Sequence, residues 1–368
     1  MRCSPHGAVN SKRGRSIDMQ TTLIRVIIAF ASGAVGAAMG GVLAIILTAA
    51  AALAGIAANL GGAEYNIVSN IAFGMFLGPH VSFGPACCAA AYAAKKELLS
   101  DSHDVVTPLA SLGRADVLLV GGVFGIAGLL LNQFFTSVAA GKVDTIAVVV
   151  LIMSITAKWL FGGSPIGKLP KGARRFGRDS AVWLPWQSAS NGMTLWLLGF
   201  CGGTLTGYIA YSMCELSAQT GNQALYEASV LLVWAFALIA FLFLAMGKQI
   251  PIINHIGIMG GYAARMAFDL GGSLGDAVLW AVAFGLLSAY AGDLLAKVFD
   301  VNGLGYVDPP SIVVAFFSAF PLTLFPLMAR QQTLKPFYSG IPYVLIACIT
   351  AFAWACTYRE RKIKPVSV

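Results

Sequence analysis

Charged residues are scarce in this chain of 368 residues: Asp, Glu, Lys and Arg together make up 11%, against 58% hydrophobic residues. Soluble proteins carry about 25% charged residues, so the composition excludes a water-soluble globular enzyme and a disordered chain. The sequence also lacks a P-loop, a His-Glu-x-x-His motif and a Cys-x-x-Cys-His motif. These absences argue against an ATPase, a zinc protease and a haem-attachment site. We therefore expect no cofactor and no metal.

Long apolar runs indicate a membrane protein instead. Mean hydropathy is +0.77, and uncharged runs long enough to cross a bilayer as helices recur between Leu23 and Cys356. The stretch from Leu23 to Lys96 has room for three crossings. The sequence thus predicts an all-α polytopic membrane protein with about ten or eleven transmembrane helices. The expected partners are the lipid bilayer and a small polar solute, and we expect no binding of nucleic acid.

Basic residues gather in segments that are expected to share one side of the membrane. They include Lys95-Lys96, a loop between residues 163 and 185, and the C-terminal segment from Arg359 to Lys364. Lys and Arg accumulate in cytoplasmic loops, so we expect a cytoplasmic C-terminus in a cell inner (plasma) membrane. A basic leader conflicts with the external N-terminus that eleven crossings require. We interpret residues 1–18 as a polar, structureless extension.

Short motifs recur at a nearly constant offset. Ser111-Leu112-Gly113 returns as Ser273-Leu274-Gly275, and Val143-Asp144 returns as Val307-Asp308. An internal duplication accounts for this pattern, and five crossings per copy would make the copies inverted. The expected organisation is five plus five plus one helices. It comprises a first repeat over 19–162, a basic linker over 163–185, a second repeat over 186–330, and an extra helix and tail over 331–368.

Each predicted repeat contains an interrupted apolar segment. Interruptions by proline and glycine free backbone groups that water or a solute can satisfy, and paired interruptions mark transport sites. Each segment also carries a histidine, His80 or His255, and ionisable residues inside a membrane indicate function. Alternatively, each histidine locks its interruption by a hydrogen bond. The predicted solute path comprises Asn66, Asn70, Pro79, His80, Ser82, Gly84, Pro85, Pro251, Asn254, His255 and Gly257.

These features favour a transporter or channel-like permease for a small polar solute. In plan the predicted layout resembles the ammonium and urea channels, which have five-plus-five inverted repeats, although their sequence motifs are not found here. By analogy alone, that resemblance implies a homo-oligomer, a trimer of separate pores. Two alternatives stay open. One is a non-catalytic subunit of a larger membrane complex, and the other is an intramembrane redox protein whose two histidines hold a metal or haem. Tyr92 and Tyr262 are interpreted as membrane-interface or packing residues.

Overall fold

The computed structural model describes residues 6–169, 171–172, 175–176, 192–248, 250 and 252–363, with backbone alone at 6–19 and 359–363. Within these residues the chain is helical and contains no strand. The part that we call the first half comprises α1 (His6–Met39), α2 (Gly41–Leu60), α3 (Phe83–Lys95), α4 (Ala115–Ala139) and α5 (Thr145–Gly162).

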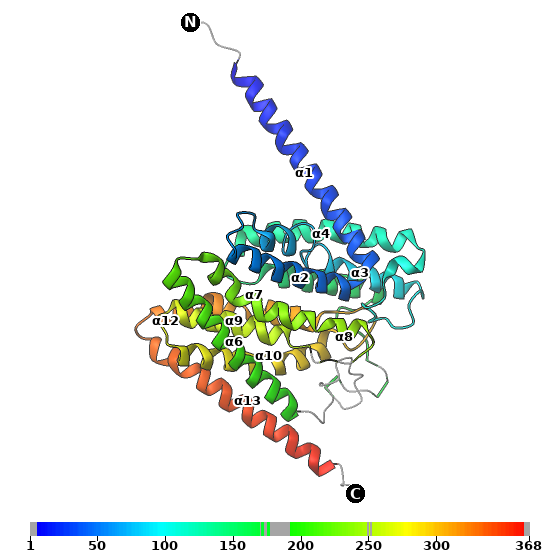
Figure 1. Cartoon of the computed structure of the whole chain (residues 1–368). Helices are drawn as coiled ribbons and strands as arrows, with labels where there is room; N and C mark the ends of the chain where they lie inside the picture. The colour runs from blue at the N-terminus through cyan, green and yellow to red at the C-terminus, as the bar shows by residue number, and fades with distance from the viewer. Residues whose placement is uncertain are drawn as a thin grey trace.

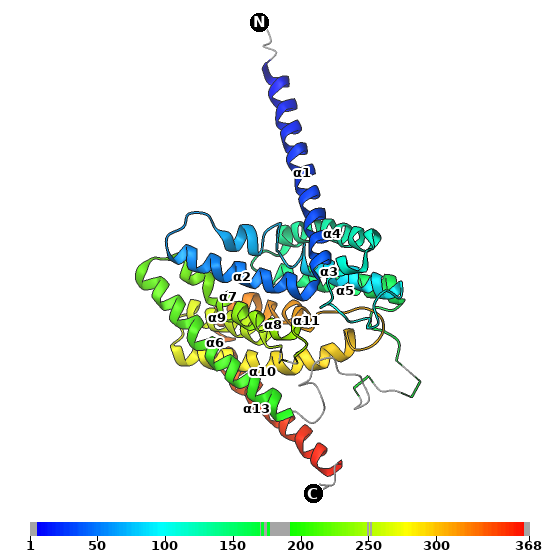
Figure 2. The same ribbon diagram turned by 45° about the vertical axis from the view of Figure 1, so that its right-hand side comes forward.

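The part that we call the second half begins after the basic loop. It comprises α6 (Gly192–Thr220), α7 (Gln223–Ile239), α8 (Phe241–Ala245), α9 (Asn254–Asp269), α10 (Leu274–Phe299), α11 (Pro309–Phe317) and α12 (Phe325–Arg330). A last helix, α13 (Lys335–Ile363), follows it. Figures 1 and 2 show the helices of the two halves packed together, with α1 extending from one side and α13 lying along the other.

Nine helical stretches in the described part of the chain are long and apolar enough to cross a membrane. Two of them combine consecutive helices, α7 with α8 and α11 with α12. Large apolar side chains such as Leu119, Leu205, Phe236 and Trp354 are exposed along these stretches. Contiguous apolar surface of this kind needs lipid or protein to cover it. The prediction of an all-helical fold is confirmed for the described residues, and the nine stretches are compatible with the predicted membrane spans, whose expected number was ten or eleven.

The long first apolar run is divided at Gly40. This residue has a φ of 87°, which a glycine adopts without the steric penalty of a side chain. A Cβ at this position would also lie 2.9 Å from the carbonyl oxygens of Val106 and Thr107. The chain therefore ends α1 and starts α2 here, at a boundary that the hydropathy pattern alone left unclear.

Helix α1 begins at His6, so it includes residues that we expected to be a structureless extension. The polar stretch is continuous with the apolar helix after it. Extending an existing helix avoids the cost of a new nucleus, which accounts for the helical backbone. Figure 1 shows this end of α1 pointing away from the other helices.

One helix pair in each half packs closely through glycine. In the first half α1 lies against α4, where a Cβ on Gly33 would be 2.2 Å from the carbonyl oxygen of Gly121. In the second half α6 lies against α10, where a Cβ on Gly285 would be 2.4 Å from the carbonyl oxygen of Gly199. Small residues allow such close approach of helices in membranes. The halves meet each other through α2 with α7 and α5 with α11.

Candidate functional site

The first interrupted segment, which contains His80, lies antiparallel to α2, and its helical structure is broken near the middle of α2. Val68 lies against Gly55 near the end of α2, and the Thr48 hydroxyl donates a 2.7 Å hydrogen bond to the Leu77 carbonyl. Cys87 of α3 then lies against Gly41 at the start of α2. Residues 61–87 therefore follow the length of α2 in the opposite direction, as two short pieces joined near the middle, and the rest of α3 extends beyond the start of α2.

The break is closed by local hydrogen bonds. The N–H groups of Val81 and Ser82 both donate to the Gly78 carbonyl, at 2.8 and 2.9 Å. The carbonyl oxygen of His80 lies against Gly128 of α4, where a Cβ would be only 1.8 Å away. The His80 ring is buried, and its Nδ1 has no hydrogen-bond partner among the described residues. This break is thus fixed against α4 by its backbone.

The second interrupted segment leads into α9. No side chain caps the N-terminus of this helix, which runs along α7 with Gly257 against Val233 and Trp234. His255 is fully enclosed, and its Nε2 lies 2.9 Å from the position that a Cβ on Gly292 of α10 would take. Neither of its ring nitrogens has a partner in the part of the chain that the structure describes.

A cavity of about 340 Å³ lies between the two halves. The first half contributes α2, the first interrupted segment and the start of α5, and the second half contributes α7, α8, α9 and α11. Its volume lies within the range of small-molecule sites. We call this space the inner cavity.

Two of the residues predicted to form a solute path line the inner cavity. They are Pro79 and Asn254, one from each interrupted segment. Asn66 and Asn70 form a local turn, in which the side-chain amide of Asn70 donates a 2.9 Å hydrogen bond to the backbone carbonyl of Asn66. Pro251 lies outside the described residues. The other predicted path residues do not line this cavity: His80, Ser82, Gly84, Pro85, His255 and Gly257.

Two aspartates that the sequence analysis used only as marks of duplication do line the inner cavity. Asp144 starts α5 and accepts a 2.9 Å hydrogen bond from the Ala147 N–H. Asp308 starts α11 and accepts a 2.8 Å hydrogen bond from the Ser311 N–H. Each carboxylate thus caps a helix that begins at the cavity wall. Their repetition at the same offset was the sequence signal that could have identified them.

Tyr262 and Arg265 also line the cavity and were not predicted to do so. The Tyr262 hydroxyl donates a 2.9 Å hydrogen bond to Asp144. The guanidinium of Arg265 lies over the rings of Tyr226 and Tyr262, with distances of 5.1 and 5.8 Å to their centroids. Cations bind aromatic faces at such distances, so α7, α9 and α5 are connected at this point.

A second space of about 230 Å³, which we call the outer cavity, adjoins the inner one. Asp269 and Arg330 line it, close to the ends of α9 and α12. Four residues line both cavities. We call these residues the constriction: Gly141, Tyr262, Arg265 and Leu322.

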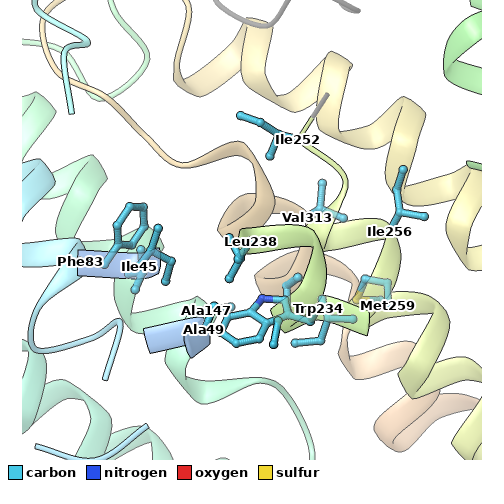
Figure 3. Packing of buried hydrophobic residues seen from close by; sticks show 14 of the residues in the cluster. Ile45, Ala49, Phe83, Ala147, Trp234, Leu238, Ile252, Ile256, Met259 and Val313 are labelled. Carbon is cyan, nitrogen blue, oxygen red and sulfur yellow. The ribbon is translucent and has the colours of Figure 1, made fainter. Parts of the chain in front are cut away.

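Aromatic side chains line the part of the inner cavity away from the constriction. Phe73 and Trp234 lie with ring centroids 5.2 Å apart, and Phe83 and Phe241 join them in the cavity wall. Figure 3 shows Trp234 in one cluster with Phe83 and Leu238. This part of the wall is therefore apolar and rich in π faces.

A polar cluster outside the inner cavity joins α5 to the segment after α10. The buried Lys158 ammonium donates to the carbonyls of Asp300 and Gly305, at 2.9 and 2.8 Å. The Asp300 carboxylate accepts a 2.8 Å hydrogen bond from the Val307 N–H. Burial raises the pKa of Asp300 to about 6, although His103 and Lys158 oppose this shift.

One protein-family model matches this chain, and it does so twice. Its description is a family of unknown function, DUF7973, and the matched residues are 16–177 and 173–329. The chain belongs to this family. No curated protein and no solved structure matches it. The two stretches that resemble the DUF7973 model meet in the basic loop between α5 and α6, so they correspond to the two halves of the structure.

Proposed function

We propose that this protein is an integral membrane transporter or channel-like permease that moves a small polar solute through the inner cavity. The observation that carries this proposal is the position of the cavity. Both halves form its walls, and one residue of each interrupted segment lines it, Pro79 and Asn254. Transport sites of repeat-built carriers lie at such junctions beside broken helices.

The proposal includes two inverted copies followed by one extra helix. The double match to one family model supports a duplication, as do the equivalent pairs α1 with α4 and α6 with α10. The segment 61–87 follows the length of α2, and we count it, with the rest of α3, as a crossing. Counting α9 with the segment before it as another adds two crossings to the nine long apolar stretches. Eleven crossings result, and five in each copy invert the second copy relative to the first.

Charge placement supports a cytoplasmic C-terminus in this arrangement. With eleven crossings, Lys95-Lys96, the basic loop and the end of α13 all fall on one side. The Arg175 guanidinium of the basic loop donates a 2.9 Å hydrogen bond to the Val298 carbonyl near the end of α10, consistent with that side. Cytoplasmic segments carry the excess of Lys and Arg. We therefore assign the protein to the cell inner (plasma) membrane, with the outer cavity toward the external side.

The constriction then acts as the gate between the external side and the inner cavity. Tyr262 and Leu322 line both cavities, and the hydrogen bond from Tyr262 to Asp144 joins the two halves between them. Opening requires this contact to break or the halves to move apart. His80 and His255 do not line this passage, so the proposal gives them no part in binding the solute.

A plug in the inner cavity tests the proposed function. Ile258 on α9 is buried and lines the cavity, so Ile258→Trp adds an indole to the path. Proteoliposome swelling with neutral, cationic and anionic solutes measures flux. We expect selective flux in the wild type and at least a tenfold loss in Ile258→Trp. Leu205→Trp, on an exposed face of α6, is the matched control and should keep the flux. Equal flux in the plugged and wild-type proteins would contradict the proposal.

A further inference from the structure

Asp308 is a buried carboxylate whose hydrogen-bond donors, in the part of the chain that the structure describes, are all neutral. It is 7% exposed and accepts hydrogen bonds from the Tyr306 hydroxyl and from the N–H and hydroxyl of Ser311. Among the described residues, no Lys, Arg or His nitrogen forms an ion pair with it. Burying a carboxylate without a cation is costly. A cation in the cavity would offset that cost.

Asn254 offers a second acceptor to the same cavity. Its side chain is 7% exposed, and its Oδ1 has no hydrogen-bond partner within the described part of the chain. Buried polar atoms in proteins are nearly always satisfied. An N–H group of a bound solute would satisfy this oxygen, and Asn254 lies in the cavity wall with Asp308.

Aromatic rings complete this part of the wall. Phe73, Phe83 and Trp234 line the cavity together with the two acceptors. Aromatic faces attract cations, most strongly where the site excludes water. A carboxylate, an amide oxygen and aromatic rings together suit an organic cation, because its nitrogen meets the acceptors and its carbon atoms meet the rings.

The one cationic side chain among the described residues that line the inner cavity lies at its other end. Arg265 belongs to the constriction and follows Asn254 by eleven positions on α9, which is about 16 Å of helix. It lies over two tyrosine rings, and Asp269 lines the outer cavity with it. Its positive charge is therefore placed at the entrance rather than beside Asp308.

We propose that the transported solute is a small organic cation, whose charged nitrogen binds Asp308 and Asn254 among the aromatic rings of the inner cavity. This inference rests on the proposed function, because it assigns a solute class to the same site. The cavity of about 340 Å³ lies within the range of small-molecule sites and is large enough for a cation of this kind.

Calorimetric binding to the full-length, detergent-solubilised protein tests this inference without measuring flux. The probes are butylammonium and its isosteres 1-butanol and butyrate. We expect butylammonium to bind at least tenfold more tightly than either isostere. Equal affinity of butylammonium and 1-butanol would overturn the assignment to an organic cation. Sodium ions that bind as tightly as butylammonium and displace it would overturn the assignment too.

Two variants locate the bound nitrogen. Asp308→Asn keeps a good helix cap but removes the charge, and it should weaken butylammonium binding at least tenfold. Asp276→Asn is the matched control, since Asp276 belongs to the capping box of α10 and does not line the cavity. Asn254→Leu keeps the branched shape of the side chain and removes the acceptor, so it tests the site even if Asp308→Asn does not fold. Unchanged binding in both cavity variants would overturn the inference.

Binding and transport can fail separately in these experiments. Butylammonium binding that depends on Asp308, without flux of any solute, supports the cation site and contradicts the permease. Flux of neutral or anionic solutes that Ile258→Trp abolishes, without butylammonium binding, supports the permease and contradicts the cation site.

Discussion

The Tyr262 hydroxyl donates a hydrogen bond of 2.9 Å to the carboxylate of Asp144. Tyr262 belongs to α9 in the second half, and Asp144 starts α5 in the first half. Both residues line the inner cavity, and Tyr262 also lines the outer one. One hydrogen bond to a carboxylate thus connects the halves at the constriction.

Removing this contact should open the passage. Hydrogen bonds to charged groups contribute about 1.5–3 kcal/mol, so Tyr262→Phe destabilises the closed constriction, and we expect solute flux to rise about tenfold in proteoliposomes. Tyr92→Phe is the matched control, because Tyr92 donates a similar bond of 3.0 Å to Asp116 away from the inner cavity. Equal flux in Tyr262→Phe and the wild type would show that this contact is no gate.

The close contact between α4 and the first break should make Gly128 intolerant of any side chain. A Cβ there would lie 1.8 Å from the His80 carbonyl oxygen, and overpacking of this kind costs about 1–3 kcal/mol. We expect Gly128→Ala to lower the free energy of unfolding by this amount, measured by thermal unfolding in detergent. Gly340→Ala on α13, where a Cβ meets nothing within 4 Å, should have no such effect. Similar stability of the two variants would contradict the close contact.

The inverted arrangement predicts where two equivalent serines lie. Ser111 and Ser273 are both exposed, each just before a helix of its half, α4 or α10. Ser111→Cys and Ser273→Cys should react with a membrane-impermeant maleimide from opposite sides of the membrane. Cys201 and Cys348 are exposed in the wild type, so the labelling of the wild type is subtracted from that of each variant. Reaction of both variants from the same side would exclude inversion.

Asp300 should make stability depend on pH. Its pKa is about 6 in the folded protein, above the ordinary value of 3.8, because it is buried. Folding therefore favours the protonated form, so its stabilising contribution is complete below pH 3.8 and is lost as the pH rises through 6. The difference corresponds to about 3 kcal/mol. Between pH 4 and pH 7, the free energy of unfolding should therefore fall less in Asp300→Asn than in the wild type. Parallel curves for the variant and the wild type would contradict the prediction.

Much of the fold could be predicted from the sequence because the membrane permits few structures. Backbone polar groups must be satisfied within each apolar segment, so the long apolar runs were expected to be helices, and α5, which covers Thr145–Gly162, is one of them. The interruption at Gly78-Pro79 was visible for the same reason. The division at Gly40 was not, because it depends on the carbonyls of Val106 and Thr107, which lie far away in the sequence.

The site was harder to predict because the sequence of a buried helix does not indicate which of its sides faces a cavity. Asn254 and His255 are neighbours on α9, and successive residues point about 100° apart on a helix. The structure turns Asn254 toward the inner cavity and His255 toward Gly292. Histidine looked the stronger candidate because it is ionisable. Asp144 and Asp308 were overlooked because they lie at helix starts, where a capping role already accounts for them.

The inner cavity belongs to neither half alone. Its walls come from α2 and α5 on one side and from α7, α9 and α11 on the other. A solute that binds one arrangement of the halves more tightly than another shifts the equilibrium between the two arrangements. By linkage, whatever favours one arrangement, such as a lipid or a substitution at their contact, changes solute affinity by the same factor. Solute binding and the rearrangement of the halves are therefore linked equilibria, so a measured change in one reports on the other.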